Sequence, residues 1–411
     1  MLLLALLGLR LPTPNDQNLA HRMKILNQNS KHKLALQIYT REHGNNNNTP
    51  ATIQAIKAYG RLGQAADALD LFHNIQRNHA KISVVAYTAI IRACATAVHW
   101  PIALSLLSDM RDAGIKPDTV CYNAALAACE RGGQWEEVQI LLTEMETGDS
   151  EVLPDRISYN TAISAASRCG EWHAAIALLE LLESQNEADP YSYASAISAC
   201  DRAGETDKAL SLFSRSQSRG SRPTEVMYNA AIRACATPEY WPAALSLLSD
   251  MQSDEIPPTV ITFNAALSAC EKGGQWEEAE LLLNEMRATG LRPDATSYHT
   301  CIASCRRACI RPAAQFILKL LRQMRRDGLQ TSLVGYTTAV NALSNAECYR
   351  AGLAVYSRLR AEHEVDKSAV ATVLKMCERG GLWSEANALL EELRVSNPEL
   401  RQIFSLPVGD C

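Results

Sequence analysis

Two kinds of apolar-patterned segment alternate along most of the chain. In residues 119–155 the first of them, YNAALAACE, has apolar residues at helical spacing, and Gly132 and Gly133 then interrupt the pattern. A second segment opens at Trp135, carries two acids in its first turn and runs to about Met145, before a Pro-Asp turn closes the unit. The pattern predicts a hairpin of two helices.

The same unit recurs with a period of about 35 residues. The tryptophans share one register, a set of cysteines lies six residues upstream, and a mostly aromatic set lies seven residues before those cysteines. These sets are Trp100, Trp135, Trp172, Trp241, Trp276 and Trp383; Cys94, Cys129, Cys200, Cys235, Cys270, Cys305 and Cys377; and Tyr87, Tyr122, Tyr159, Tyr193, Tyr228, Phe263, Tyr298, Tyr336 and Val370. Since each unit packs only on its neighbours, the period predicts an all-α solenoid of tandem helix–turn–helix repeats.

The repeat register also predicts the domain organisation. Residues 17–48 are expected to form a degenerate capping hairpin with an Asn-rich loop, and residues 402–411 a tail. The short apolar run within residues 1–16 has no basic residue before it, so this segment fits either a targeting leader or an arbitrary N-terminus. The ten units of the array are expected at 49–83, 84–118, 119–155, 156–189, 190–224, 225–259, 260–294, 295–332, 333–366 and 367–401.

Composition narrows the chemistry that such an array can carry. The net charge of −5 argues against a simple basic nucleic-acid binder, although local charge matters more than the total. The 13 cysteines include no C-x-x-C pair, so the common zinc spacing is missing and no metal or cofactor is expected. The cysteines of the repeat register are expected to pack as small apolar residues in a reducing compartment, and the tryptophans to be buried at the hairpin junctions.

The motifs VCYNAALAAC, ISYNTAISAA, VMYNAAIRAC and ITFNAALSAC, with the closing segments GIKPD and GLRPD, resemble the pentatricopeptide repeat family. The resemblance covers about residues 49–401 and fits a P-type array, one without a catalytic domain at its C-terminal end. It implies a right-handed superhelix of helical hairpins. It also implies sequence-specific binding of single-stranded RNA, one base per repeat, in a plastid or a mitochondrion.

Asn and Thr dominate the position after the aromatic register, although both are mediocre helix formers. One interpretation is helix capping. The resemblance instead implies that this residue reads a base edge together with the residue that closes the repeat, an arrangement in which an Asp can orient an Asn amide. The pairs are Thr88 with Asp118, Asn123 with Asp155, Asn160 with Asp189, Asn229 with Thr259, Asn264 with Asp294, and Thr337 with Asp366.

The resemblance implies a base for most of these pairs. The Thr–Asp pairs correspond to guanine, the Asn–Asp pairs to uracil and the Asn–Thr pair to a pyrimidine. Two pairs, Ala194 with Thr224 and His299 with Ser332, depart from the pattern and are left unread. The expected target, from Thr88 onward, is 5′-GUU-N-Y-U-N-G-3′, where Y is a pyrimidine.

Two further registers are candidates for contacts with RNA. An apolar or aromatic residue lies one place after the start of the repeat and is expected either to pack between hairpins or, as the resemblance implies, to stack on bases: Val85, Val120, Ile157, Tyr191, Val226, Ile261 and Val334. A basic residue lies two places past the cysteine register and is expected either to stabilise a helix C-terminus or to contact phosphates: Arg61, Arg131, Arg168, Arg202, Lys272, Arg307 and Arg379.

No sequence motif indicates an enzyme. The H-x-E and P-C-x-x-C elements of a zinc deaminase, Gly-rich phosphate loops and nucleophile elbows are all missing from the sequence. The expected function is therefore occupancy of an organellar transcript, with single-stranded RNA as the partner, a processing enzyme or another protein as a second partner, and no membrane. The alternative is an α-solenoid scaffold that binds a peptide or a helix.

Overall fold

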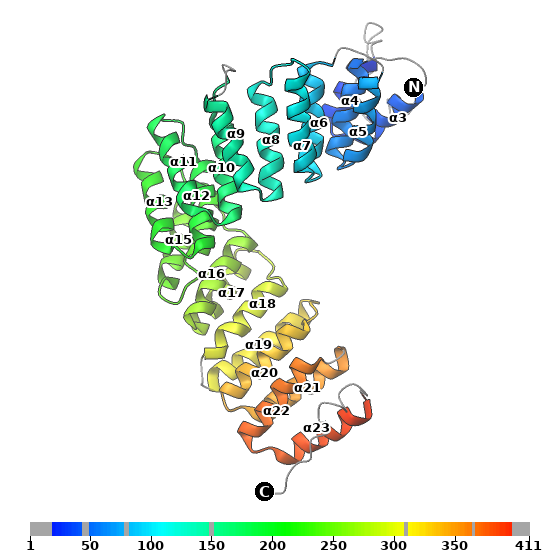
Figure 1. The fold of residues 1–411 in the computed structure, drawn as a ribbon. Helices are drawn as coiled ribbons and strands as arrows, with labels where there is room; N and C mark the ends of the chain where they lie inside the picture. The colour runs from blue at the N-terminus through cyan, green and yellow to red at the C-terminus, as the bar shows by residue number, and fades with distance from the viewer. Residues whose placement is uncertain are drawn as a thin grey trace. The chain divides into compact units, whose positions relative to one another are not determined.

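The structure, a computed structural model, describes residues 19–42, 49–77, 82–147, 152–307, 311–363 and 366–396. These residues form α-helices and one short 3₁₀ helix, with no strand among them, and within each of the two units described below consecutive helices run side by side in chain order (Figure 1). The predicted all-α solenoid of helical hairpins is confirmed. Within the described ranges no helix is long and apolar enough to span a bilayer. Residues 1–16, 402–411 and Asn45–Asn48, for which a leader, a tail and a loop are expected, lie outside the described residues.

The chain divides into two compact units, residues 1–203 and 204–411, and the boundary falls inside the expected repeat 190–224. The described residues of the first unit form five hairpins and one further helix: α2 (Leu19–Gln28) with α3 (His32–Glu42), α4 (Thr49–Arg61) with α5 (Ala65–Arg77), α6 (Val84–Thr96) with α7 (Trp100–Asp112), α8 (Thr119–Gly132) with α9 (Trp135–Thr147), α10 (Arg156–Cys169) with α11 (Trp172–Ser184), and α12 (Pro190–Ala203).

In the second unit the described residues form a single helix followed by five hairpins. Its elements are α13 (Thr206–Ser218), α14 (Glu225–Ala234) with α15 (Trp241–Ser253), α16 (Val260–Gly273) with α17 (Trp276–Ala288), α18 (Ala295–Ser304) and the 3₁₀ helix η1 (Cys305–Arg307) with α19 (Arg311–Arg326), α20 (Leu333–Asn345) with α21 (Tyr349–Glu362), and α22 (Lys367–Gly380) with α23 (Trp383–Ser396). In both units the first helix of each hairpin packs on the first helix of the next.

Local sequence fixes where the first helices begin and end. Asp118 caps α8 by accepting a hydrogen bond from the backbone N–H of Cys121, and Asp155 caps α10 through Ser158 in the same way. The C-cap residue Gly133 has φ of +66°, a left-handed conformation that glycine adopts at little cost. The residues that close the predicted repeats are therefore the N-caps of the following helices.

The aromatic register and the cysteine register form the core. Tyr193, Tyr228, Phe263 and Tyr298 are at most 1% exposed, and the cysteines predicted to pack as apolar residues are all buried. Burial raises the pKa of the Cys94 thiol to about 11, so this thiol stays protonated near neutrality. The prediction that these cysteines pack as apolar residues is confirmed.

The tryptophan register lies at the hairpin junctions, but its burial was overestimated. Each tryptophan is the first residue of a second helix, where five of the six are partly exposed, and Trp383 is 62% exposed. In the interior of the array the ring packs against the next repeat: a Cβ added at Gly132 would lie 2.5 Å from Cδ1 of Trp100. For Trp383 the prediction of burial is wrong, and no glycine of the described residues lies against its ring.

Candidate nucleic-acid interface

The predicted base-reading residues occupy one position on the first helices. Asn123 is the fifth residue of α8, Asn160 the fifth of α10 and Asn264 the fifth of α16. Thr88, Asn229 and Thr337 hold the same position in their own helices. Because the caps are the closing residues five places earlier in the chain, the capping interpretation of the Asn and Thr position is wrong.

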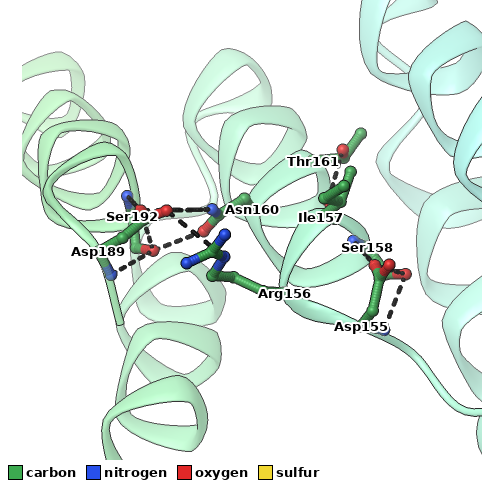
Figure 2. A network of polar contacts seen from close by, with 8 residues as sticks. All are labelled: Asp155, Arg156, Ile157, Ser158, Asn160, Thr161, Asp189 and Ser192. Atoms are coloured by element: carbon green, nitrogen blue, oxygen red, sulfur yellow. Dashed lines mark hydrogen bonds and ion pairs between the residues drawn. The ribbon is translucent and has the colours of Figure 1, made fainter. Parts of the chain in front are cut away.

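Three of the Asn side chains share the same arrangement of partners. Nδ2 of Asn160 donates to both carboxylate oxygens of Asp189 over 3.4 Å, and Oγ of Ser192 donates to Oδ1 of Asn160 over 2.5 Å (Figure 2). The same bonds recur at 3.1 and 2.6 Å around Asn123 and at 3.2 and 2.6 Å around Asn264. We call these sets the Asn–Asp–Ser triads: Asn123–Asp155–Ser158, Asn160–Asp189–Ser192 and Asn264–Asp294–Ser297.

The Thr pairs lack this coupling. The Thr88 hydroxyl donates to the carbonyl of Val84 over 2.8 Å and lies 3.0 Å from Sγ of Cys121, while Asp118 serves as a helix cap. The Thr337 hydroxyl likewise donates to the carbonyl of Val334 over 3.0 Å. The structure therefore brings Asn and Asp together in three predicted pairs and leaves the two Thr–Asp pairs without a direct hydrogen bond.

At two further reading positions, those of Asn229 and His299, the side chains make neither of these arrangements of hydrogen bonds. Asn229 donates to Glu225 over 3.5 Å, Thr259 donates to the same carboxylate over 3.1 Å, and Oδ1 of Asn229 is buried without a protein partner. Nε2 of His299 is also buried without a partner, and its ring lies where a side chain on Gly335 would be. These two positions hold unpaired polar atoms, which are rare in protein interiors.

The predicted stacking residues are exposed, so packing between hairpins does not explain them. All seven are between 44% and 71% exposed, whereas the aromatic residues two places later are buried. Large apolar side chains at a repeated exposed position are suited to contact with the faces of bases. These residues are Val85, Val120, Ile157, Tyr191, Val226, Ile261 and Val334.

The predicted phosphate-contacting residues are exposed but also bridge neighbouring repeats. Where the structure gives their bonds, each reaches back to the C-terminal turn of the preceding first helix, which supports the helix-terminus interpretation in modified form. Lys272 is exposed, and the side chain of Arg307 lies outside the described residues. The bonds are Arg61 to the carbonyl of Asn27, Arg131 to that of Ala95 at 3.4 Å, Arg202 to that of Ser167 at 2.9 Å, Arg168 to Glu130 at 2.7 Å and Arg379 to Asn345 at 3.1 Å.

A groove of about 710 Å³ in the first unit is lined by residues from all three predicted sets, the base-reading, the stacking and the phosphate-contacting residues. Its walls come from α4, α6, α8 and α10. The predicted residues that line it are Thr88, Asp118 and Asn123 for reading, Val85, Val120 and Ile157 for stacking, and Arg61 and Arg131 for phosphate contacts. Residues far apart in the sequence thus form one continuous surface with exposed apolar, polar and basic groups.

Sequence reasoning missed several groups at this surface. Lys57 and Arg92 line the groove and share one repeat register, a signal that was available because they are 35 residues apart. Burial lowers the pKa of Lys57, and the charges of Arg92, Lys24 and Arg61 lower it further. Arg156 lies 3.7 Å from Asp189. The Ser members of the triads were missed as well, since nothing in one repeat alone links them to an Asn of the previous repeat.

The Asp155 carboxylate is held in its charged form. Burial by itself raises its pKa, but hydrogen bonds from the backbone of Ser158, from the Asn123 amide and from the Ser158 hydroxyl outweigh burial and leave the pKa below the ordinary value. A carboxylate that stays ionised can only accept hydrogen bonds, so it fixes the Asn123 amide with Nδ2 toward Asp155.

The fold and this surface define a class of protein, the tandem helical-hairpin repeats. Three family models match the sequence of this chain: "PPR repeat family" over residues 258–307, "Pentatricopeptide repeat domain" over 70–134 and 177–237, and "PPR repeat" over 55–79, 120–149 and 157–186. Together these matches cover more than half of the chain, and the chain belongs to the pentatricopeptide repeat family. A search of curated protein sequences gives no match.

A solved structure gives the same fold. The pentatricopeptide repeat protein PPR10 from maize is 20% identical and superposes with a TM-score of 0.56 over 96% of this chain and 63% of its own. PPR10 in complex with an 18-nt psaJ RNA element is also 20% identical, with a TM-score of 0.47 over 91% of this chain and 58% of its own. This chain thus spans about three fifths of the length of these neighbours.

Proposed function

We propose that this protein binds single-stranded RNA in a sequence-specific manner, with one base facing each first helix. The observation that carries the proposal is the exposed apolar register beside the hydrogen-bonded Asn–Asp pairs, which combines a stacking surface with an oriented amide at each of several repeats. Membership of the pentatricopeptide repeat family supports it, as does the RNA in the complex of the similar protein PPR10.

The proposed target keeps the order 5′-GUU-N-Y-U-N-G-3′. The three Asn–Asp pairs read uracil at the second, third and sixth bases, because each oriented amide offers one donor and one acceptor to a base edge. Thr88 with Asp118 and Thr337 with Asp366 read guanine at the ends. Asn229 with Thr259 reads a pyrimidine.

The protein acts in RNA metabolism by occupancy in a plastid or a mitochondrion: it stabilises, processes or promotes translation of a transcript without catalysing a reaction itself. The basic residues Arg61, Arg131, Arg202 and Arg379 support this mode, because a guanidinium that bonds one carbonyl or amide keeps further donors for phosphate. Lys57 and Arg92 add two cations to the same groove.

Binding to a defined RNA tests the proposal. Fluorescence anisotropy would compare an RNA carrying the proposed target with a permuted RNA of identical composition, at several salt concentrations. We expect tighter binding to the target. Seven phosphate contacts at about −0.7 each also predict a log–log salt slope near −5, so that doubling the salt weakens binding about 30-fold. Equal, salt-insensitive binding of both RNAs, or none by a folded protein, would refute the proposal and favour a protein-binding scaffold.

A further inference from the structure

A buried hydroxyl completes each of the three Asn–Asp pairs. Ser158, Ser192 and Ser297 are 0% exposed, and each is the third residue of the helix that the Asp caps. The Ser158 oxygen accepts a hydrogen bond from the backbone N–H of Asp155 over 3.1 Å. Its single proton has two acceptors within reach, Oδ1 of Asn123 at 2.6 Å and Oδ1 of Asp155 at 3.0 Å, and the shorter contact favours Asn123.

The residue type at this third helical position correlates with the type of the reading residue in the preceding repeat. Every Asn at the reading position is followed, one repeat later, by a hydroxyl at the third helical position, and no other reading residue is. The Asn pairs are Asn123/Ser158, Asn160/Ser192, Asn229/Thr262 and Asn264/Ser297; the others are Ile53/Ala86, Thr88/Cys121, Ala194/Met227, His299/Gly335 and Thr337/Ala369.

Helix capping alone does not account for this correspondence. Asp118 caps α8 through the backbone N–H of Cys121 over 2.8 Å, and Asp366 caps α22 through that of Ala369 over 2.8 Å. Both caps form without a hydroxyl at the third position, and in both cases the reading residue of the preceding repeat is a Thr. A cap therefore does not require a hydroxyl at this position, and in the three triads the hydroxyl also donates to the Asn amide of the preceding repeat.

We infer that Ser158, Ser192 and Ser297 are positioning residues for base discrimination, each of which fixes the Asn amide of the preceding repeat. The inference rests on the proposed RNA-binding function. In the observed orientation Nδ2 faces a carboxylate and Oδ1 faces a hydroxyl. An amide rotated by 180° would place its oxygen against the carboxylate, where neither group has a proton to share.

The fixed amide presents one remaining N–H and one remaining lone pair to a base in defined places. Uracil has its ring N–H between two carbonyl acceptors, whereas cytosine has a ring acceptor and an exocyclic amine donor. An amide in a fixed orientation matches the hydrogen-bonding edge of one of these bases better than that of the other. Without the hydroxyl, the amide retains only the carboxylate as a guide and can shift to match either pyrimidine.

Asn229 provides an internal contrast. The hydroxyl of Thr262 lies 3.2 Å from that of Thr259 and accepts from the Thr259 backbone N–H over 3.1 Å. Oδ1 of Asn229 is left without a protein partner, and its Nδ2 bonds Glu225 instead of a closing Asp. The amide at this repeat is not held from both sides, so we expect its preference for uracil over cytosine to be weaker than at the triads.

The experiment measures dissociation constants of the full chain for the proposed target and for RNAs in which one uracil at a time is replaced by cytosine. The variant Ser158→Ala is compared with Ser158→Thr, which keeps the hydroxyl, and with Ser158→Cys, whose side chain the same position of α8 already accommodates in Cys121. Ser164→Ala is the matched control: Ser164 lies on the same helix and donates over 3.0 Å to Glu130 rather than to an Asn.

We expect Ser158→Ala and Ser158→Cys to reduce the uracil preference facing Asn123 about 5-fold, the effect of one hydrogen bond, and to leave the preference facing Asn264 unchanged. Ser158→Thr and Ser164→Ala should retain it. If the wild type prefers uracil and both Ser158→Ala and Ser158→Cys keep that preference, Ser158 is only a helix cap and the inference fails alone. If the wild type has no preference for uracil at any repeat, the proposed function fails, and the inference with it.

Discussion

The reading side chains of this protein depend on groups that the next repeat supplies. The Asn160 amide donates to Asp189, whose carboxylate accepts from the backbone N–H of Ser192 at the start of α12, and it accepts from the Ser192 hydroxyl (Figure 2). The carboxylate thus orients an amide, and by the same geometry in α10 and α18 it also satisfies backbone N–H groups at a helix start. Stability and recognition therefore share the same residues.

Substitution of the closing acids separates these two roles. Asp366→Ala removes a cap and should lower the free energy of unfolding by about 1 kcal/mol. Asp294→Ala removes a cap and also leaves the Asn264 amide without its acceptor, which should cost about 1 kcal/mol more. Urea unfolding followed by circular dichroism measures both. Equal losses in the two variants would mean that the Asn–Asp bond contributes nothing to the folded state.

His299 is expected to make the free energy of unfolding depend on pH near and below its ordinary pKa. Burial lowers its pKa below the ordinary value of 6.5, and the charge of Asp294 only partly opposes this. The unfolded chain therefore binds a proton at a higher pH than the folded chain, so the free energy of unfolding should fall as the pH drops below about 6.5. The lowered pKa of Asp155 also contributes to stability, but this contribution is lost only as the pH falls below the ordinary Asp value of 3.8. Its pH range therefore does not overlap with that of His299.

Urea unfolding between pH 5 and 8 measures this effect. We expect the loss of stability toward pH 5 to be smaller in His299→Gln than in the wild type, since the glutamine does not titrate. The same pH dependence in both proteins would show that His299 is protonated equally well in the folded and unfolded chains.

At the scale of elements, the junction between hairpins is set by one close contact. Gly132 ends α8 where the Trp100 ring, from the second helix of the preceding hairpin, approaches within 2.5 Å of the position of an added Cβ. Gly133 follows with φ of +66° and nothing near its Cβ position. The two glycines are therefore needed for different reasons, one for space between repeats and one for backbone conformation.

A double-mutant cycle distinguishes these reasons. Gly132→Ala should lower the free energy of unfolding by about 1–3 kcal/mol through overpacking, and the loss should shrink in a Trp100→Ala background. Gly133→Ala should cost about 1 kcal/mol in either background, because its strain lies in the backbone. A Gly132→Ala effect that is the same with and without the Trp100 ring would show that the contact is not what requires glycine.

The helices and reading positions could largely be predicted from the sequence, because periodic Trp, Cys and Tyr residues, Pro-Asp turns and Gly pairs are local signals. The Asn123–Asp155 pair was predicted from the resemblance to a known family. The Ser158 contact and the partial exposure of Trp100 were not, since both depend on how one repeat packs on the next. Residue type alone also could not show that Thr88 bonds its own helix instead of Asp118.

At the scale of the whole chain, the features proposed for recognition occur in both compact units. Two triads, those of Asn123 and Asn160, lie in the first unit, and the triad of Asn264 lies in the second. The net charge of −5 does not oppose RNA binding, because cations such as Lys57, Arg61 and Arg92 gather in one groove. Local potential rather than total charge governs such binding.

Selection of bound RNAs from a randomised single-stranded pool, at two salt concentrations, tests the central claim most directly. The wild type should enrich a motif that contains GUU, and the double variant Asn123→Ala with Asn160→Ala should lose the two uracils while retaining the rest of the motif. Salt-sensitive binding without any enriched motif, or the same motif from both proteins, would contradict base reading by the oriented Asn amides.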